Sequence, residues 1–254
     1  MKQIPNLFTL LNLIFGCVAI VFTLQNGIIT FTSEEGAQLI DIPEKIWMAS
    51  LFIGLAAVVD FLDGFIARLF KAASDMGKQL DSLADVVSFG VAPSMIVFQF
   101  LRLSYAQQVD GLDSSSVWLY AAFIIPAAAA YRLARFNLDS SQQYSFKGVP
   151  VPAAGLLIAS LPLIYWNVNE AWVIQLLLNK WFLFGIIFFV SYLMVSTLPI
   201  MSLKFKNFSL NDNWPKYFLI LIAVAAVLLL RWLSVPVIFI VYVLVSLSFK
   251  NKIA

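Results

Sequence analysis

The chain has 254 residues, of which 61% are hydrophobic and only 12% are charged, and its mean hydropathy is +0.90. A soluble domain carries about 25% charged residues, so this composition excludes an ordinary soluble protein and predicts repeated membrane crossings. The net charge of +2, with no basic tract, gives no reason to expect a nucleic-acid partner.

Two residue types limit the chemistry of this sequence. It contains no histidine and one cysteine, Cys17. Histidine nucleophiles, histidine bases and histidine metal ligands are therefore excluded, and a single cysteine cannot form an intrachain disulfide. Any proton transfer near neutral pH must use a carboxylate, a lysine or a tyrosine.

Hydrophobic runs along the chain predict an all-α fold, a polytopic transmembrane bundle of about eight helices. A tilted helix needs about 20 residues to span the hydrocarbon core, and two of the runs are shorter than that. Loop residues and charges separate the runs, which lie near 6–24, 46–68, 80–101, 117–136, 151–166, 181–201, 215–232 and 234–249.

The distribution of lysine and arginine predicts the orientation of the bundle. With the N-terminus inside, twelve of these residues fall in cytoplasmic segments and four fall on the opposite side. We therefore expect both termini in the cytoplasm. The ends of the second helix and the start of the third would then also face the cytoplasm.

The segment from Asp60 to Asp85 places four carboxylates in this apolar chain and reads D-x2-D-G-x2-A-R-x8-G-x3-D-x3-D. Asp60 and Asp63 are three residues apart, and Asp81 and Asp85 are four apart, so each pair would share one helix face. Charges at membrane depth are costly and are expected to be functional. Four facing aspartates would repel one another, and oxygen ligands suit hard cations. The spacing predicts a site for two divalent ions, Mg²⁺ or Mn²⁺.

The complete motif resembles the signature of the CDP-alcohol phosphotransferases, integral membrane enzymes that make phospholipids from a CDP-linked lipid and an alcohol. The resemblance covers roughly residues 3–200. It implies that an alcohol oxygen attacks the lipid-side phosphorus and releases CMP. It also implies that Asp60, Asp63 and Asp81 are metal ligands, and that Asp85 contacts the second ion and is the general base.

Residues around the motif are candidates for binding CDP-diacylglycerol. Gly64 and Ala67 lie on the aspartate face and leave room for cytidine and diphosphate, although close helix packing would also explain small residues there. Arg68 would clamp phosphate with its planar guanidinium. The resemblance adds residues of the connection and of the first helix, namely Ser74, Gly77, Asn6, Thr9 and Asn12. For the last three, capping and interhelical hydrogen bonds are the alternative.

Two stretches outside this motif resemble the phosphatidylserine synthase branch of the family. The first is residues 81–93, and the second is residues 131–137 followed by 146–154. Serine is a zwitterion, so a serine-specific site needs cationic groups for its carboxylate. The candidate serine-binding residues are Arg132, Arg135, Asn137 and Lys147. The alternative role for the three cationic residues, Arg132, Arg135 and Lys147, is to anchor this part of the chain on the cytoplasmic side of the membrane.

We therefore expect CDP-diacylglycerol and L-serine as substrates of an enzyme in the bacterial inner membrane. Its active site would face the cytoplasm, among membrane lipids, and we expect a homodimer. Another acceptor, such as glycerol 3-phosphate, an inositol phosphate or choline, is the alternative. A cation transporter is less favoured because no inverted repeat is visible. Residues 1–200 would form the phosphotransferase domain, and residues 201–254 an extension with two further transmembrane helices and no motif.

Overall fold

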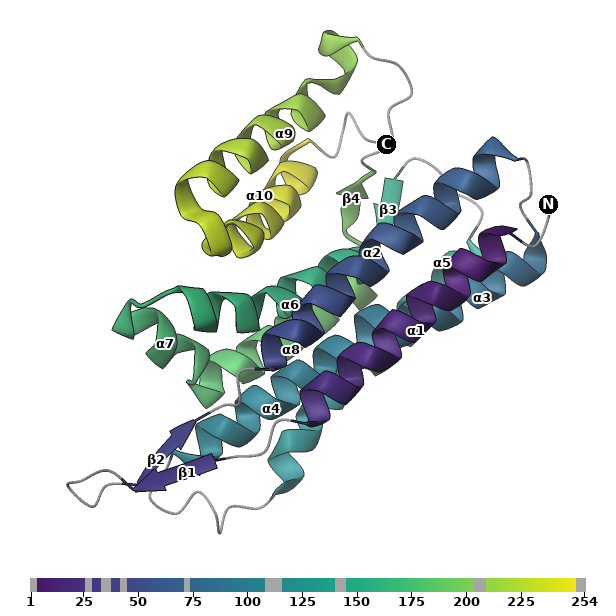
Figure 1. Ribbon diagram of the computed structural model, residues 1–254. Coiled ribbons are helices and arrows are strands. Elements are labelled where there is room, and N and C mark those ends of the chain that lie inside the picture. The colour runs from purple at the N-terminus through teal and green to yellow at the C-terminus, as the bar shows by residue number, and fades with distance from the viewer. Residues whose placement is uncertain are drawn as a thin grey trace.

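The computed structural model describes residues 4–25, 29–32, 38–41, 45–70, 74–107, 116–139, 145–202 and 209–249. These residues form a bundle of long helices with two small β-ribbons at its ends (Figure 1). The all-α polytopic fold is confirmed. The two ribbons were not predicted from the sequence.

The first two helices pack against each other along the bundle. They are α1 (Ile4–Leu24) and α2 (Ile46–Leu69). Between them, β1 (Ile29–Thr32) pairs with β2 (Gln38–Asp41) in an antiparallel ribbon. This ribbon lies at the end of the bundle opposite the start of α1 (Figure 1).

The third predicted helix is a continuous helical stretch of three parts, which are α3 (Asp75–Asp85), η1 (Val86–Val91) and α4 (Ala92–Ala106). The middle part is a π-helix, in which the amide of Ala92 donates to the carbonyl of Val87, five residues earlier. Pro93 has no amide hydrogen for the carbonyl of Phe89, so an α-helical hydrogen bond is impossible there. The π-helix was not predicted.

The next segments complete the bundle around this stretch. They are η2 (Ser116–Phe123, a 3₁₀-helix), α5 (Ile124–Leu138), α6 (Val151–Asn167), α7 (Ala171–Leu177) and α8 (Lys180–Val195). Before α6, β3 (Ser145–Lys147) pairs with β4 (Pro199–Met201), which follows α8. The sixth predicted helix was expected to continue to residue 201. It ends at Val195, because the chain turns into an extended strand at Pro199.

The C-terminal segment forms a helical hairpin. It consists of α9 (Leu210–Leu230), the short η3 (Arg231–Leu233) and α10 (Ser234–Ser248). Arg231 has a φ of 48°, which reverses the chain. α10 packs on α6 and β4, while α9 lies outside it (Figure 1). Leu228 and Leu229 of α9 are 75% and 81% exposed, as expected for side chains in contact with lipid.

Among the described residues, a helix is present at each of the eight predicted positions. Five helical stretches are long and apolar enough to cross a membrane, and α7 with α8, bent by 62°, adds a sixth. One of the five, Asn213–Ser248, is the hairpin and contains two helices. α6 is apolar but shorter, with 17 residues. The protein is therefore an integral membrane protein.

The π-helix η1 lies at the centre of the bundle, where small residues let three helices approach it. A methyl group on Gly16 of α1 would overlap Ser88, and Gly90 faces Ala129 of α5 at 3.2 Å from its ideal Cβ position. On the third side, Gly155 of α6 leaves only 2.9 Å between its ideal Cβ position and the Cα of Phe89. This packing holds the stretch that carries the third and fourth aspartates.

Candidate active site

Three aspartates from two helices meet at one point near the end of the bundle. Asp60 and Asp63 come from the C-terminal part of α2, and Asp81 comes from α3. One carboxylate oxygen from each lies within 4.8 Å of the other two. The predicted convergence of the two helices is therefore present in the structure.

The geometry of this cluster fits a hard divalent cation. Oxygen ligands around Mg²⁺, bound at 2.0–2.1 Å, lie about 3–4 Å from one another. The three oxygens lie within 4.8 Å of one another, close to that spacing. Without a cation, three carboxylates so close together in an apolar bundle repel each other, with little water to screen them.

The fourth aspartate lies deeper in the bundle. Asp85, the last residue of α3, is 6% exposed and is not one of the three clustered carboxylates. Its Oδ1 accepts a hydrogen bond of 3.3 Å from Nδ2 of Asn12. It lies on the same helix as Asp81, one turn further along, where its carboxylate is within hydrogen-bonding range of Asp60 at the inner edge of the cluster.

Polar side chains of α1 orient the acidic residues. Thr9 Oγ1 donates to Asp63 Oδ2 at 2.7 Å, and Asn12 contacts Asp85 as described. Hydrogen-bond partners of this kind fix the direction of carboxylates that bind a metal. The sequence interpretation placed Thr9 and Asn12 against CDP-lipid, and the structure adds direct contacts with two aspartates.

Asn12 also has an unused acceptor inside the site. Its Oδ1 is buried without a hydrogen-bond partner, while its backbone carbonyl accepts from Ser88 Oγ at 2.9 Å. A buried polar atom without a partner is costly. This acceptor is therefore suited to a water molecule or a substrate hydroxyl that enters beside Asp85.

The residues proposed for the nucleotide line the connection between α2 and α3. Ser74 caps α3, since its Oγ accepts from the amide of Gly77 at 3.0 Å. The ideal Cβ position of Gly77 lies 3.0 Å from Asn6 Oδ1, so a side chain at this position would crowd Asn6. Gly64 and Ala67 are partly exposed on α2. The side chain of Arg68 and residues 71–73 lie outside the described part of the chain.

Arg132 has a position unlike those of the other candidate cations. It is 5% exposed, and its guanidinium lies 5.8 Å from the ring centre of Phe136 and 5.9 Å from that of Phe146. Its Nε is buried without a hydrogen-bond partner. The carboxylate of Asp85 and the hydroxyl of Tyr242 both lie within electrostatic range of it. A buried guanidinium with an unused donor is suited to an anionic group.

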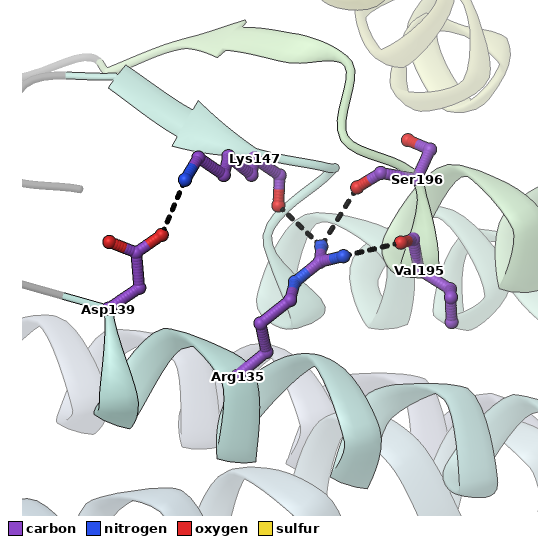
Figure 2. A network of polar contacts seen from close by, with 5 residues as sticks. All are labelled: Arg135, Asp139, Lys147, Val195 and Ser196. Atoms are coloured by element: carbon purple, nitrogen blue, oxygen red, sulfur yellow. Dashed lines mark hydrogen bonds and ion pairs between the residues drawn. The ribbon is translucent and has the colours of Figure 1, made fainter. Parts of the chain in front are cut away.

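Arg135, by contrast, is bonded to the main chain (Figure 2). Nη1 donates to the carbonyl of Val195 at 2.7 Å. Nη2 donates to those of Ser196 at 2.8 Å, Lys147 at 3.0 Å and Met194 at 3.5 Å, while Nε, as in Arg132, is buried without a partner. Three of these carbonyls are at the C-terminal end of α8, which has no further helical amides to offer them. Arg135 therefore joins α5, α8 and β3.

The other two candidates for serine binding also have partners within the protein. Asn137 Nδ2 donates to Ser82 Oγ at 2.7 Å, and the backbone carbonyl of Asn137 accepts from Lys78 Nζ at 3.0 Å. Both contacts join α5 to α3. Lys147 Nζ pairs with Asp139 Oδ2 at 2.7 Å, and its side chain is half exposed (Figure 2).

Two features of the site were missed from the sequence. The π-helix directly after Asp85 was not expected, although the combination of Gly90 and Pro93 is a signal of irregular helix. The second is Tyr242, which comes from the C-terminal hairpin and lies near Arg132. No motif in the hairpin indicated such a contact.

Comparison with known proteins is consistent with this site. The family model described as CDP-alcohol phosphatidyltransferase matches residues 2–192. Three similar proteins are all named CDP-diacylglycerol–serine O-phosphatidyltransferase. That of Mycobacterium leprae is 29% identical over 95% of this chain and 72% of its own length. That of Helicobacter pylori J99 is 32% identical over 88% of this chain and 80% of its own length. That of Bacillus subtilis is 34% identical over 65% of this chain and 78% of its own length. The chain belongs to the CDP-alcohol phosphatidyltransferase family.

Proposed function

We propose that this protein transfers the phosphatidyl group of CDP-diacylglycerol to the hydroxyl of L-serine, giving phosphatidylserine and CMP. The observation that carries the proposal is the set of three converging carboxylates beside a buried fourth, in a membrane bundle of this family. The named activity of the similar proteins supports serine as the acceptor.

In the proposed reaction, the serine oxygen forms a bond to the phosphorus that carries diacylglycerol, and the bond from that phosphorus to the oxygen of CMP breaks. Two divalent ions, Mg²⁺ or Mn²⁺, held by Asp60, Asp63, Asp81 and Asp85, would neutralise the diphosphate and polarise its oxygens. Asp85 takes the proton of the serine hydroxyl, because it lies at the inner edge of the cluster, beside the unused acceptor of Asn12.

The remaining residues bind and orient the substrates. The small residues Gly64, Ala67 and Gly77 leave the cytidine diphosphate room against the backbone, and Arg68 contacts a phosphate. Arg132 binds the serine carboxylate with its unused Nε donor. We assign Arg135 to the fold rather than to serine, because Nη1 and Nη2 of its guanidinium already have four carbonyl partners.

The test measures CMP release by the purified full chain with CDP-diacylglycerol, each candidate acceptor and either Mg²⁺ or Mn²⁺. We expect turnover with L-serine, loss of turnover in EDTA, and recovery when the metal is returned. Turnover with glycerol 3-phosphate above that with L-serine would refute the acceptor, and full activity in EDTA would refute the metal mechanism.

Single substitutions test the roles of the aspartates. Asp60→Ala should abolish turnover, while Asp75→Ala, an exposed aspartate of the same region, should leave it intact. Asp85→Asn should lower kcat by about 10²–10⁴, the usual cost of losing a general base, and retain binding of CDP-diacylglycerol. Near-normal kcat in Asp85→Asn would assign the base to another group.

We further propose that the site faces the cytoplasm of a bacterial cell and that two copies form a homodimer. The lysine and arginine distribution supports the orientation. Met76, an exposed residue of α3, can be replaced by cysteine in a Cys17→Ala background. An impermeant maleimide should label it in inside-out vesicles and not in right-side-out ones. Lys45→Cys, before α2 at the opposite end, should be labelled in right-side-out vesicles and not in inside-out ones. Crosslinking in membranes tests the dimer.

A further inference from the structure

The C-terminal hairpin lies beyond the residues that the family model matches, yet α10 holds a strand next to the site. Tyr242 Oη donates to the carbonyl of Met201 at 2.8 Å, and the amide of Met201 donates to Ser246 Oγ at 3.1 Å. Ser246 Oγ in turn donates to the carbonyl of Tyr242 at 2.7 Å. Both main-chain polar groups of Met201 are thus bonded to side chains of α10.

These contacts are buried, which makes them sensitive to small changes. Tyr242 is 7% exposed, Ser246 is fully buried, and Met201 is 2% exposed. In such a place a polar group that loses its partner finds no water to replace it. The strand end is therefore held firmly by α10.

Because β4 pairs with β3, holding β4 in place also holds Phe146 of β3, whose ring lies next to Arg132. Met201 and Ile200 of β4 lie opposite Ser145 and Phe146 of β3. The ring of Phe146 lies 5.9 Å from the guanidinium carbon of Arg132. A shift of β4 would move Phe146, and with it one wall of the space that holds the guanidinium.

Tyr242 also lies near Arg132 itself, since its hydroxyl is within electrostatic range of the guanidinium. The hydroxyl hydrogen is used by Met201, so the oxygen presents its lone pairs to its other neighbours. Arg132 thus has Phe146 and Phe136 beside its guanidinium, Tyr242 from the hairpin, and Asp85 from the site.

We propose that α10 positions the acceptor-binding arginine: Tyr242 and Ser246 hold β4, and through Phe146 they direct Arg132 toward the acceptor carboxylate. The C-terminal hairpin is then part of the serine site and more than a lipid-facing attachment. This inference rests on the proposed role of Arg132.

The test compares substitutions in the full chain, purified in detergent, by steady-state kinetics for both substrates. Tyr242→Phe keeps the ring and removes the hydroxyl, and Ser246→Ala removes the second contact. Each should raise KM for L-serine about fivefold to tenfold, the size of one lost hydrogen bond, with KM for CDP-diacylglycerol unchanged. Ser234→Ala, a buried serine at the start of α10, is the matched control and should change neither constant.

A double-mutant cycle separates the inference from the proposed function. If α10 acts through Arg132, Tyr242→Phe should have no further effect on KM for serine in an Arg132→Ala or Arg132→Lys background. Additive effects would overturn the inference, as would an equal rise of both KM values in Tyr242→Phe. If Arg132→Ala and Arg132→Lys raise KM for serine and Tyr242→Phe does not, only the positioning role is wrong. If both Arg132 variants bind serine normally, the proposed acceptor site itself is wrong, and the inference falls with it.

Discussion

The hydrogen bond from Thr9 to Asp63 leads to a prediction that separates two roles for the first helix. Thr9→Val keeps the shape of the side chain and removes the hydroxyl that donates to Asp63 Oδ2 at 2.7 Å. Thr9 is buried, so water cannot easily take the place of its hydroxyl. The loss of a hydrogen bond to a charged group costs about 1.5–3 kcal/mol, equivalent to roughly 10- to 150-fold in an equilibrium constant.

If Thr9 orients a metal-binding carboxylate, this loss appears in the affinity for metal. Loss of such an orienting partner typically weakens metal binding by about 10–100-fold, which agrees with the hydrogen-bond estimate. We therefore expect Thr9→Val to need about 10–100 times more Mg²⁺ or Mn²⁺ for half-maximal activity. At saturating metal, KM for CDP-diacylglycerol should be close to that of the unsubstituted protein.

The assay is CMP release measured over a metal titration, with Thr9→Ser as the variant that retains the hydroxyl. Thr23→Val is the matched control, because Thr23 is also buried on α1 but donates to the carbonyl of Ala19, one turn earlier in the same helix. An unchanged metal requirement together with a raised KM for CDP-diacylglycerol would refute the orienting role. Thr9 would then contact the lipid substrate, as the sequence analysis expected.

Two further predictions concern stability. Arg135→Ala should lower the free energy of unfolding by about 2–4 kcal/mol, because it removes several hydrogen bonds to carbonyls, seen as a lower thermal midpoint. Lys147→Ala, which breaks an exposed ion pair, should cost at most about 1 kcal/mol. If Arg135→Ala leaves the thermal midpoint unchanged and raises only KM for serine, then Arg135 binds the acceptor and does not mainly stabilise the fold. Gly155→Ala should destabilise by about 1–3 kcal/mol, because its methyl group would crowd Phe89. Gly54→Ala, within α2, has open space and should be neutral or stabilising by up to about 1 kcal/mol. Equal midpoints for the two variants would therefore contradict the packing.

Most of the helical bundle could be predicted from the sequence because its signal is local. Apolar runs about 20 residues long identify membrane helices without knowledge of their neighbours. The four aspartates were also predictable, since their spacing within two helices determines which of them share a face. The convergence of Asp60, Asp63 and Asp81 follows from that spacing once the two helices are adjacent.

The contacts between distant segments could not be predicted in this way. Arg132 and Arg135 are three residues apart on one helix, and each has a buried Nε without a partner. Yet Arg135 binds four carbonyls through Nη1 and Nη2, whereas the guanidinium of Arg132 lies beside two aromatic rings. The difference arises because α8 ends at Val195, six residues earlier than its apolar run suggests, and leaves carbonyls near Arg135. Likewise, no local pattern places Tyr242 beside Arg132, more than a hundred residues away.

The π-helix also makes the protein sensitive to the number of residues between its acidic end and its apolar end. An α-helix turns by about 100° per residue, whereas the wider turn of a π-helix, with its hydrogen bonds to the fifth residue, turns by less. The six residues Val86–Val91 therefore turn the chain about as far as five α-helical residues would. If these six residues were α-helical instead, α3 would rotate by about 100° relative to α4, and Asp81 would turn away from the carboxylates of α2. We infer that this six-residue segment sets the rotational phase between the two halves of the third helix, and that its length matters beyond the identity of its side chains.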